Sequence, residues 1–176
     1  MPEVDEPIEF SAYDPGWPAH AAAEEHRLAG HLPAGTKVEH IGSTSVHGIP
    51  GKPTLDLMVG LEAHHNREAV RSALVRAGYE DLGEAGVPGR IYLRRRDSAS
   101  FNIALVERGG RLWLANLALR DFLRKHPHAA LEYAATKRAA IEAGHLTLLA
   151  YSNYKSNLLT RLVAKAIEWS TSPRSG

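Results

Sequence analysis

One stretch decides the fold of this chain, and it reads His40-Ile-Gly-Ser-Thr-Ser-Val-His-Gly-Ile-Pro-Gly-Lys-Pro-Thr-Leu-Asp56. Apolar-rich segments at residues 36–41 and 54–61 lie on either side of its central loop. Glycines, serines and prolines exclude a regular helix or strand between those segments. The sequence therefore predicts two strands joined by a polar loop, with Asp56 near the start of the second strand.

The loop has the composition of a phosphate-binding site. Gly42 lets the backbone approach a ligand closely, and the hydroxyls and successive amides of Ser43 and Thr44 suit phosphate. Lys52 adds a positive charge, while Asp56 is the candidate ligand for a Mg²⁺ ion that bridges phosphate oxygens. The same composition is also typical of an ordinary tight surface turn, so both interpretations stay open.

The segments before and after the polar loop predict the α+β fold class. We expect further strands that extend one sheet, followed by a C-terminal half made of helices. The predicted strands are residues 79–82, 90–94 and 100–106, and the predicted helices are residues 19–32, 66–77, 112–125, 128–143 and 147–169. A single domain is expected over residues 10–169, with residues 1–9 and 170–176 as flexible tails.

The last predicted helix carries a wide apolar stripe that needs a packing partner. Leu158, Leu162 and Ala166 belong to this stripe. Because a single α+β domain buries its helices against its sheet, we expect the stripe to lie on the sheet.

Composition narrows the function classes. The chain has 176 residues and a formal charge of +1, with 21 basic and 20 acidic side chains, which does not indicate a nucleic-acid-binding protein. It has no cysteine, which excludes thiol catalysis, cysteine-bound zinc and disulfides. No apolar run reaches the roughly 18 residues of a membrane span. We therefore expect a cytoplasmic protein without a membrane partner, and the oligomeric state stays open.

Five parts of the chain carry distinctive motifs. In chain order they are Tyr13-Asp-Pro-Gly-Trp-Pro18, residues 40–56, Gly83-Glu-Ala-Gly-Val-Pro-Gly-Arg90, Arg120-Asp-Phe-Leu-Arg-Lys-His-Pro127 followed by Tyr133 and Lys137, and the pair Tyr151 and Lys155. Together these motifs resemble the GrpB family over roughly residues 10–168. The resemblance implies a nucleotidyltransferase-like fold with a mixed β-sheet and flanking helices.

The chain departs from the pattern of active members of that superfamily. They carry two aspartates spaced by one residue, which share a strand face and hold magnesium together. Here those positions are Asp56 and Met58, and methionine is a poor ligand for a hard cation. A His-x-His pair found in many GrpB relatives aligns with Asn102 and Ala104. The resemblance therefore does not extend to a conventional two-metal centre.

Other candidate site residues each have an ordinary structural interpretation. His40 and His47 could contact a ligand or be packed and solvated residues, respectively, and Arg90 follows a rigid Gly-Val-Pro-Gly turn that could place it over the site. The run Arg94-Arg95-Arg96 is interpreted as a charged hairpin edge. Arg120, Lys137 and Lys155 are either phosphate contacts or buried ion pairs, and the sequence does not decide between these roles.

Three functions are compatible with these residues. The first is binding of ATP, another nucleotide or a phosphorylated or anionic small molecule, with Mg²⁺; the binding residues would be Gly42, Ser43, Thr44, Lys52, Arg90 and Lys155. If the protein is a transferase, Asp56 and Ser43 are its candidate catalytic residues, and it would act by positioning and electrostatics.

The second function is that of a catalytically degenerate ligand-binding or protein-interaction module. The third is a different reaction on an anionic small molecule, in which Asn102, His40 or His47 replaces the lost acids. Nothing in the sequence indicates haem, flavin or an iron–sulfur cluster.

Overall fold

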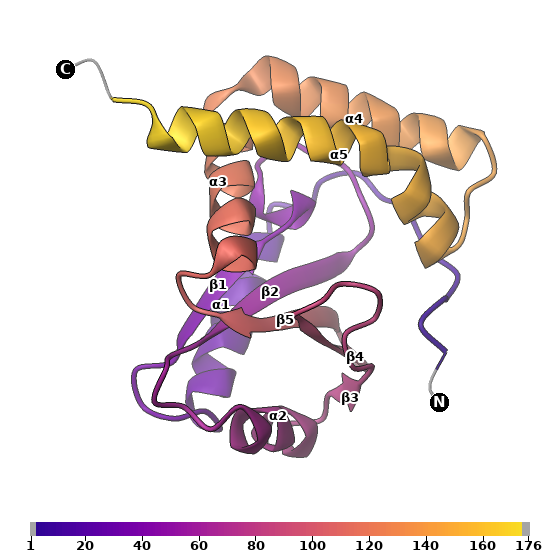
Figure 1. Ribbon diagram of the computed structural model, residues 1–176. Coiled ribbons are helices and arrows are strands. Elements are labelled where there is room, and N and C mark those ends of the chain that lie inside the picture. The colour runs from indigo at the N-terminus through magenta and orange to yellow at the C-terminus, as the bar shows by residue number, and fades with distance from the viewer. Residues whose placement is uncertain (1–2, 174–176) are drawn as a thin grey trace.

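The computed structural model describes residues 3–173, and it confirms an α+β architecture. Figure 1 shows a mixed sheet with helices α1 and α2 beside it and with α3, α4 and α5 gathered at one end. In chain order the elements are α1 Trp17–Ala29, β1 Lys37–Ile41, the short 3₁₀ helix η1 Ser43–Ser45, β2 Thr54–Leu61, α2 Arg67–Arg76, β3 Glu80–Asp81, β4 Ile91–Arg96, β5 Ser100–Glu107, α3 Arg111–Lys125, α4 Pro127–Glu142 and α5 Leu148–Thr171.

The sheet has the strand order β1-β2-β5-β4-β3. Strands β2 and β5 are parallel, and every other neighbouring pair is antiparallel. The parallel pair sets Asp56 directly beside Asn102 and Met58 beside Ala104. Since β2 also pairs with β1, the strand that carries Asp56 has a neighbour on both sides, and the polar loop leads straight into it.

Alternation along the strands gives the sheet two different faces. Leu55, Leu57 and Val59 of β2 belong to the main core, to which helices α1 and α2 contribute Leu28 and Leu74. The opposite face of β2 carries Asp56, Met58 and Gly60, and helix α3 packs against this face. The candidate site therefore lies on the face that the helical half approaches.

The apolar stripe of α5 packs differently from the prediction. Leu158, Leu162 and Ala166 join a second core with residues of α3 and α4 and with Val46 and Ile49 of the polar loop. The three C-terminal helices thus bury one another and hold the loop, because their own apolar faces supply enough partners. None of the helices in residues 3–173 has both the length and the apolar character needed to cross a membrane.

The N-terminal segment differs from the predicted tail over the part that the structure describes. Glu6 forms ion pairs with Arg94 and Arg96 of β4, and its backbone carbonyl accepts a hydrogen bond from Leu148. Ile8 donates in turn to the carbonyl of Leu146. Ion pairs thus hold this segment to β4, and backbone hydrogen bonds hold it to the chain around Leu146 and Leu148, so it extends the packed structure. Residues 1, 2 and 174–176 lie outside the described range.

Candidate functional site

The polar loop is held in place by three parts of the chain. Arg124 of α3 donates through Nε to the carbonyl of Ser45 at 2.9 Å, and Lys137 of α4 donates to the carbonyl of Pro50. Gly51 and Ser11 exchange two backbone hydrogen bonds of 2.9 and 3.0 Å. The loop that leads to Asp56 therefore has one defined position, fixed by residues far away in the sequence.

Gly42 is the residue that lets the loop pass over Asp56. Its φ of 71° and ψ of −174° lie in a region that only glycine adopts readily. A Cβ atom at this position would lie 2.7 Å from Oδ2 of Asp56. The backbone and the carboxylate thus approach each other as closely as a glycine permits.

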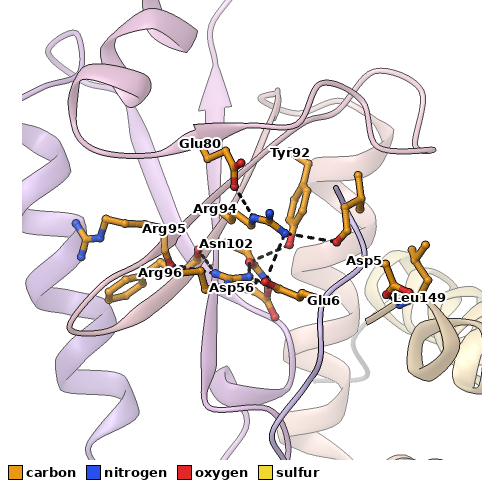
Figure 2. Close-up of polar contacts among 12 residues, drawn as sticks. Asp5, Glu6, Asp56, Glu80, Tyr92, Arg94, Arg95, Arg96, Asn102 and Leu149 are labelled. Atoms are coloured by element: carbon orange, nitrogen blue, oxygen red, sulfur yellow. Dashed lines mark hydrogen bonds and ion pairs between the residues drawn. The ribbon is translucent and has the colours of Figure 1, made fainter. Parts of the chain in front are cut away.

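Asn102 orients Asp56 from the neighbouring strand. Its Nδ2 donates to Oδ1 of Asp56 at 2.7 Å, while its Oδ1 accepts from the Tyr92 hydroxyl at 2.9 Å and from Arg96 Nη2 at 2.8 Å. Figure 2 shows this network, which continues from Arg96 to Glu6. Asn102 therefore has no oxygen lone pair to spare for a metal, and it does not replace a lost acid.

Three lysines lie near enough to Asp56 to feel its charge, and we call Lys52, Lys137 and Lys155 the lysine cluster. The charge of Asp56 acts on all three ammonium groups. Within residues 3–173, no carboxylate oxygen comes within 4.0 Å of any of them. The charges of Lys52 and Lys155, and that of Lys137 when it is protonated, are therefore not neutralised by direct contact with a carboxylate.

Burial changes the protonation of these lysines. Desolvation lowers the pKa of Lys137 to about 6, with repulsion from Lys155 adding to the effect. It also lowers the pKa of Lys155 to about 8 and lowers the pKa of Lys52, although Asp56 opposes both changes. A bound anion would favour the charged forms, so these groups are suited to exchange protons when a ligand binds.

A repeated spacing on two helices forms part of this cluster. Tyr133 and Lys137 on α4 are four residues apart, as are Tyr151 and Lys155 on α5, so each lysine lies on the same face as its tyrosine. Lys137 Nζ lies 5.0 Å from the Tyr133 ring centre, and Lys155 Nζ lies 4.4 Å from that of Tyr151. Sequence reasoning left these lysines undecided, and this Tyr-x-x-x-Lys repeat is the signal that would have placed them together.

Ser43 joins the lysine cluster through the backbone of Gly51. A Cβ atom on Gly51 would lie 2.5 Å from Lys137 Nζ and 3.1 Å from Ser43 Oγ. Both groups therefore crowd the same backbone position. The hydroxyl of Ser43 and the amine of Lys137 lie close enough to contact one ligand group together.

Several predicted site residues lie elsewhere. His40 faces the core side of β1, where its Nε2 is 2.8 Å from Thr44 Oγ1, and burial lowers its pKa to about 4. The Thr44 hydroxyl is thereby engaged by His40. His47 packs against Tyr13, and Arg120 pairs with Glu39 and Asp121. Partners within the fold thus occupy the polar groups of His40, Thr44 and Arg120, whereas His47 is exposed.

Arg90 lies near Asp56 but apart from the lysines. It lines a cavity of about 230 Å³ together with Asp56, Gly42, Tyr92 and Asn102. Its guanidinium carbon is 5.0 Å from the centre of the Tyr92 ring. Asp56 is thus shared by two environments, one formed by the lysine cluster and one by this cavity.

The residues present do not fit the metal centre that the fold family implies. Met58 occupies the second acidic position and is fully buried, in contact with Ile41 and Trp113. Within residues 3–173 there is no group of three or more His, Asp or Glu side chains that could hold a metal ion. Among these residues Asp56 would be the single ligand of a metal ion. The positive charge of the nearby lysines would also repel a cation at this position.

Asn102→Asp tests this conclusion about the metal. The variant sets a second carboxylate against Asp56, so its free energy of unfolding at pH 7 is expected to fall by about 2 kcal/mol. Millimolar Mg²⁺ is expected to restore part of that loss, since two carboxylates on neighbouring strands can share one cation. Urea unfolding with and without Mg²⁺ measures both effects.

Asn153→Asp is the matched control, because Asn153 is exposed on α5. Its stability should stay close to that of the wild type and be insensitive to Mg²⁺. Equal behaviour of the two variants would contradict the role of Asn102 in orienting Asp56.

Comparison with known proteins places these features in a wider group. The family model described as GrpB protein matches residues 7–165. UPF0157 protein PA4798 of Pseudomonas aeruginosa is 31% identical over 175 residues, covering 93% of this chain and 69% of its own. The crystal structure of conserved protein GrpB from Enterococcus faecalis has a TM-score of 0.82 at 29% identity, over 93% of this chain and all of that one. The Cid1 poly(U) polymerase has a TM-score of 0.48 at 17% identity, over 71% of this chain and 41% of its own.

Proposed function

The chain belongs to the GrpB family, and from this premise we propose that it binds a phosphorylated or polyanionic small molecule, a nucleotide being the leading candidate. Ser43 and the lysine cluster would contact the phosphate groups, and Asp56 would orient the lysines. The observation that carries the proposal is the presence of three desolvated lysines without a carboxylate in contact.

A polyanion is the ligand that would best lower the electrostatic repulsion among these lysines. Like charges that are held together and partly desolvated raise the energy of the free protein, and phosphate oxygens would neutralise them through charge-assisted hydrogen bonds. Lysine is a common point-charge partner for phosphate. Because the lysines supply the charge, we infer that binding does not depend on a divalent cation.

Binding without nucleotidyl transfer is the form of the proposal that the residues favour. Transfer in this fold depends on carboxylates that hold metal ions, and Met58 is buried where the second carboxylate would stand. A ligand-binding or accessory module therefore fits better than a transferase. Nucleotidylated product that disappears in Asp56→Asn would contradict this preference.

Calorimetric titration with ATP and with inorganic tripolyphosphate tests the proposal, each with EDTA or with Mg²⁺. Lys155→Ala is expected to weaken binding by about 10- to 100-fold, since a hydrogen bond to a charged group contributes about 1.5–3 kcal/mol. Ser43→Ala should weaken it less, and EDTA should leave it unchanged.

Lys165→Ala is the control, because it removes a lysine from the exposed side of the same helix. It should bind as the wild type does. If Lys155→Ala and Lys165→Ala bind both anions equally well, the site assignment is wrong; if binding requires Mg²⁺, the lysines are not the main source of charge.

A further inference from the structure

We propose that the 230 Å³ cavity beside Asp56 is a second binding site, for a small branched carboxylate that also carries a hydroxyl or amino group. Its walls come from β1, β2, β4, β5 and α3, and from the loops that follow β1 and precede β4. The volume is below the roughly 300–1,000 Å³ of pockets for drug-sized ligands, so the ligand must be small.

Arg90 supplies a fixed positive charge to this cavity. Its Nη2 donates to the carbonyls of Glu84 and Ala85 at 3.2 and 3.0 Å. Ala85 has a φ of 46°, which is uncommon for a residue with a side chain, and this conformation belongs to the turn whose carbonyl groups hold Arg90. The guanidinium therefore keeps its place without help from a ligand.

No acid within the described chain neutralises Arg90 by contact. No carboxylate oxygen of residues 3–173 lies within 4.0 Å of its nitrogens, and its buried Nε has no hydrogen-bond partner there. Every other arginine that lines β4 has an acidic partner, namely Arg94, Arg95 and Arg96. A ligand carboxylate matches the planar guanidinium better than a single charge would.

The lining of the cavity also offers hydrogen-bond acceptors. Asn116 donates through Nδ2 to the carbonyl of Leu112 at 2.8 Å, which leaves its side-chain oxygen as an acceptor. Asp56 provides carboxylate oxygens. A hydroxyl or amino group on the ligand would donate to these atoms. Val87, Ala104 and Leu112 add apolar lining for a short branched body.

This site does not depend on the lysine cluster. Asp56 acts on the charge of Arg90 and on that of the three lysines, whereas none of the lysines is among the charges that influence Arg90. Two ligands could therefore meet at Asp56, each held by different residues. Failure of one proposal leaves the other open to its own test.

Titration with 2-hydroxyisovalerate and with valine, followed by NMR or calorimetry, tests the second site, and 3-methyl-1-butanol serves as a probe without a carboxylate. Both carboxylates should bind saturably and the alcohol should not. Arg90→Gln and Ala104→Leu should each weaken binding at least 10-fold, the first by removing the charge and the second by filling the cavity. Arg76→Gln, which changes an exposed arginine, should have no effect.

Ala104→Leu keeps Arg90 and its turn intact, so it remains informative if Arg90→Gln unfolds. It should also leave tripolyphosphate binding unchanged, which separates the two sites. Absence of saturable binding of both carboxylates to the wild type overturns the proposal. So does equal binding by Ala104→Leu, or by a folded Arg90→Gln.

Discussion

Gly42→Ala is expected to lower the free energy of unfolding by about 3 kcal/mol, because backbone strain and overpacking each cost about 1–3 kcal/mol. The backbone at Gly42 adopts a conformation that only glycine takes readily. The added methyl group would also lie 2.7 Å from Oδ2 of Asp56. Since Asp56 is held by Asn102, it cannot move away without breaking that hydrogen bond. Urea unfolding followed by circular dichroism measures the loss.

Gly35→Ala is the matched control for this prediction. Gly35 also has a positive φ, 81°, but nothing lies within 4 Å of the position that its Cβ would take. Its loss should be limited to about 1 kcal/mol of backbone strain. If the two variants unfold at the same urea concentration, the close approach of Gly42 to Asp56 does not exclude a side chain at position 42.

Stability is expected to rise with pH between 6.5 and 8.5 in the wild type and to rise less in Lys137→Met. The pKa of Lys137 is lowered to about 6 in the folded protein by burial, whereas an unfolded lysine titrates near 10.4. The unfolded state therefore binds one more proton across this window, and raising the pH favours the folded state. The difference between the two proteins should change by about 2 kcal/mol over these two pH units, because one pKa unit corresponds to 1.36 kcal/mol.

The window follows from the direction of the shift. Below pH 6 both states carry the proton, so the difference between the two proteins should stop changing. His40, whose pKa is lowered to about 4 in the folded protein, adds to the slope near pH 6.5 in both proteins, because its unfolded pKa is about 6.5, and its contribution cancels in their difference. Urea unfolding at several pH values gives the slopes. Lys125→Met, at an exposed position on α3, should follow the wild type, and parallel lines for Lys137→Met would contradict the burial of this charge.

Local sequence patterns predicted most of the secondary structure. The two strands around the polar loop, the α2 helix and the three C-terminal helices agree with the expected ranges within a few residues. Helix α2, for example, begins after Asn66, whose side chain accepts a hydrogen bond from the Ala69 amide. Such caps and apolar periodicities act between residues that are near in sequence, and they can therefore be recognised without the fold.

Packing partners were less accessible to prediction. The apolar pattern of α5 predicts packing on the sheet, yet this stripe lies against α3, α4 and the loop. The acidic start of the chain indicates a tail, yet Glu6 binds the arginines of β4. An amphipathic pattern shows that one face of a helix will be buried, and a charged segment indicates that an oppositely charged partner will bind it. Neither pattern identifies the surface that the segment packs against.

By itself, the sequence determined the family, the α+β class, the glycine-rich loop and the strand that carries Asp56. Only the tertiary structure decided which polar residues are free to bind. It occupied His40, Thr44, Arg120 and Asn102 with partners. It also brought Lys52, Lys137 and Lys155 around one carboxylate from three separate segments. The physical reason is that a charge or a hydroxyl is available to a ligand only where folding has not already satisfied it, and those partners are distant in the sequence.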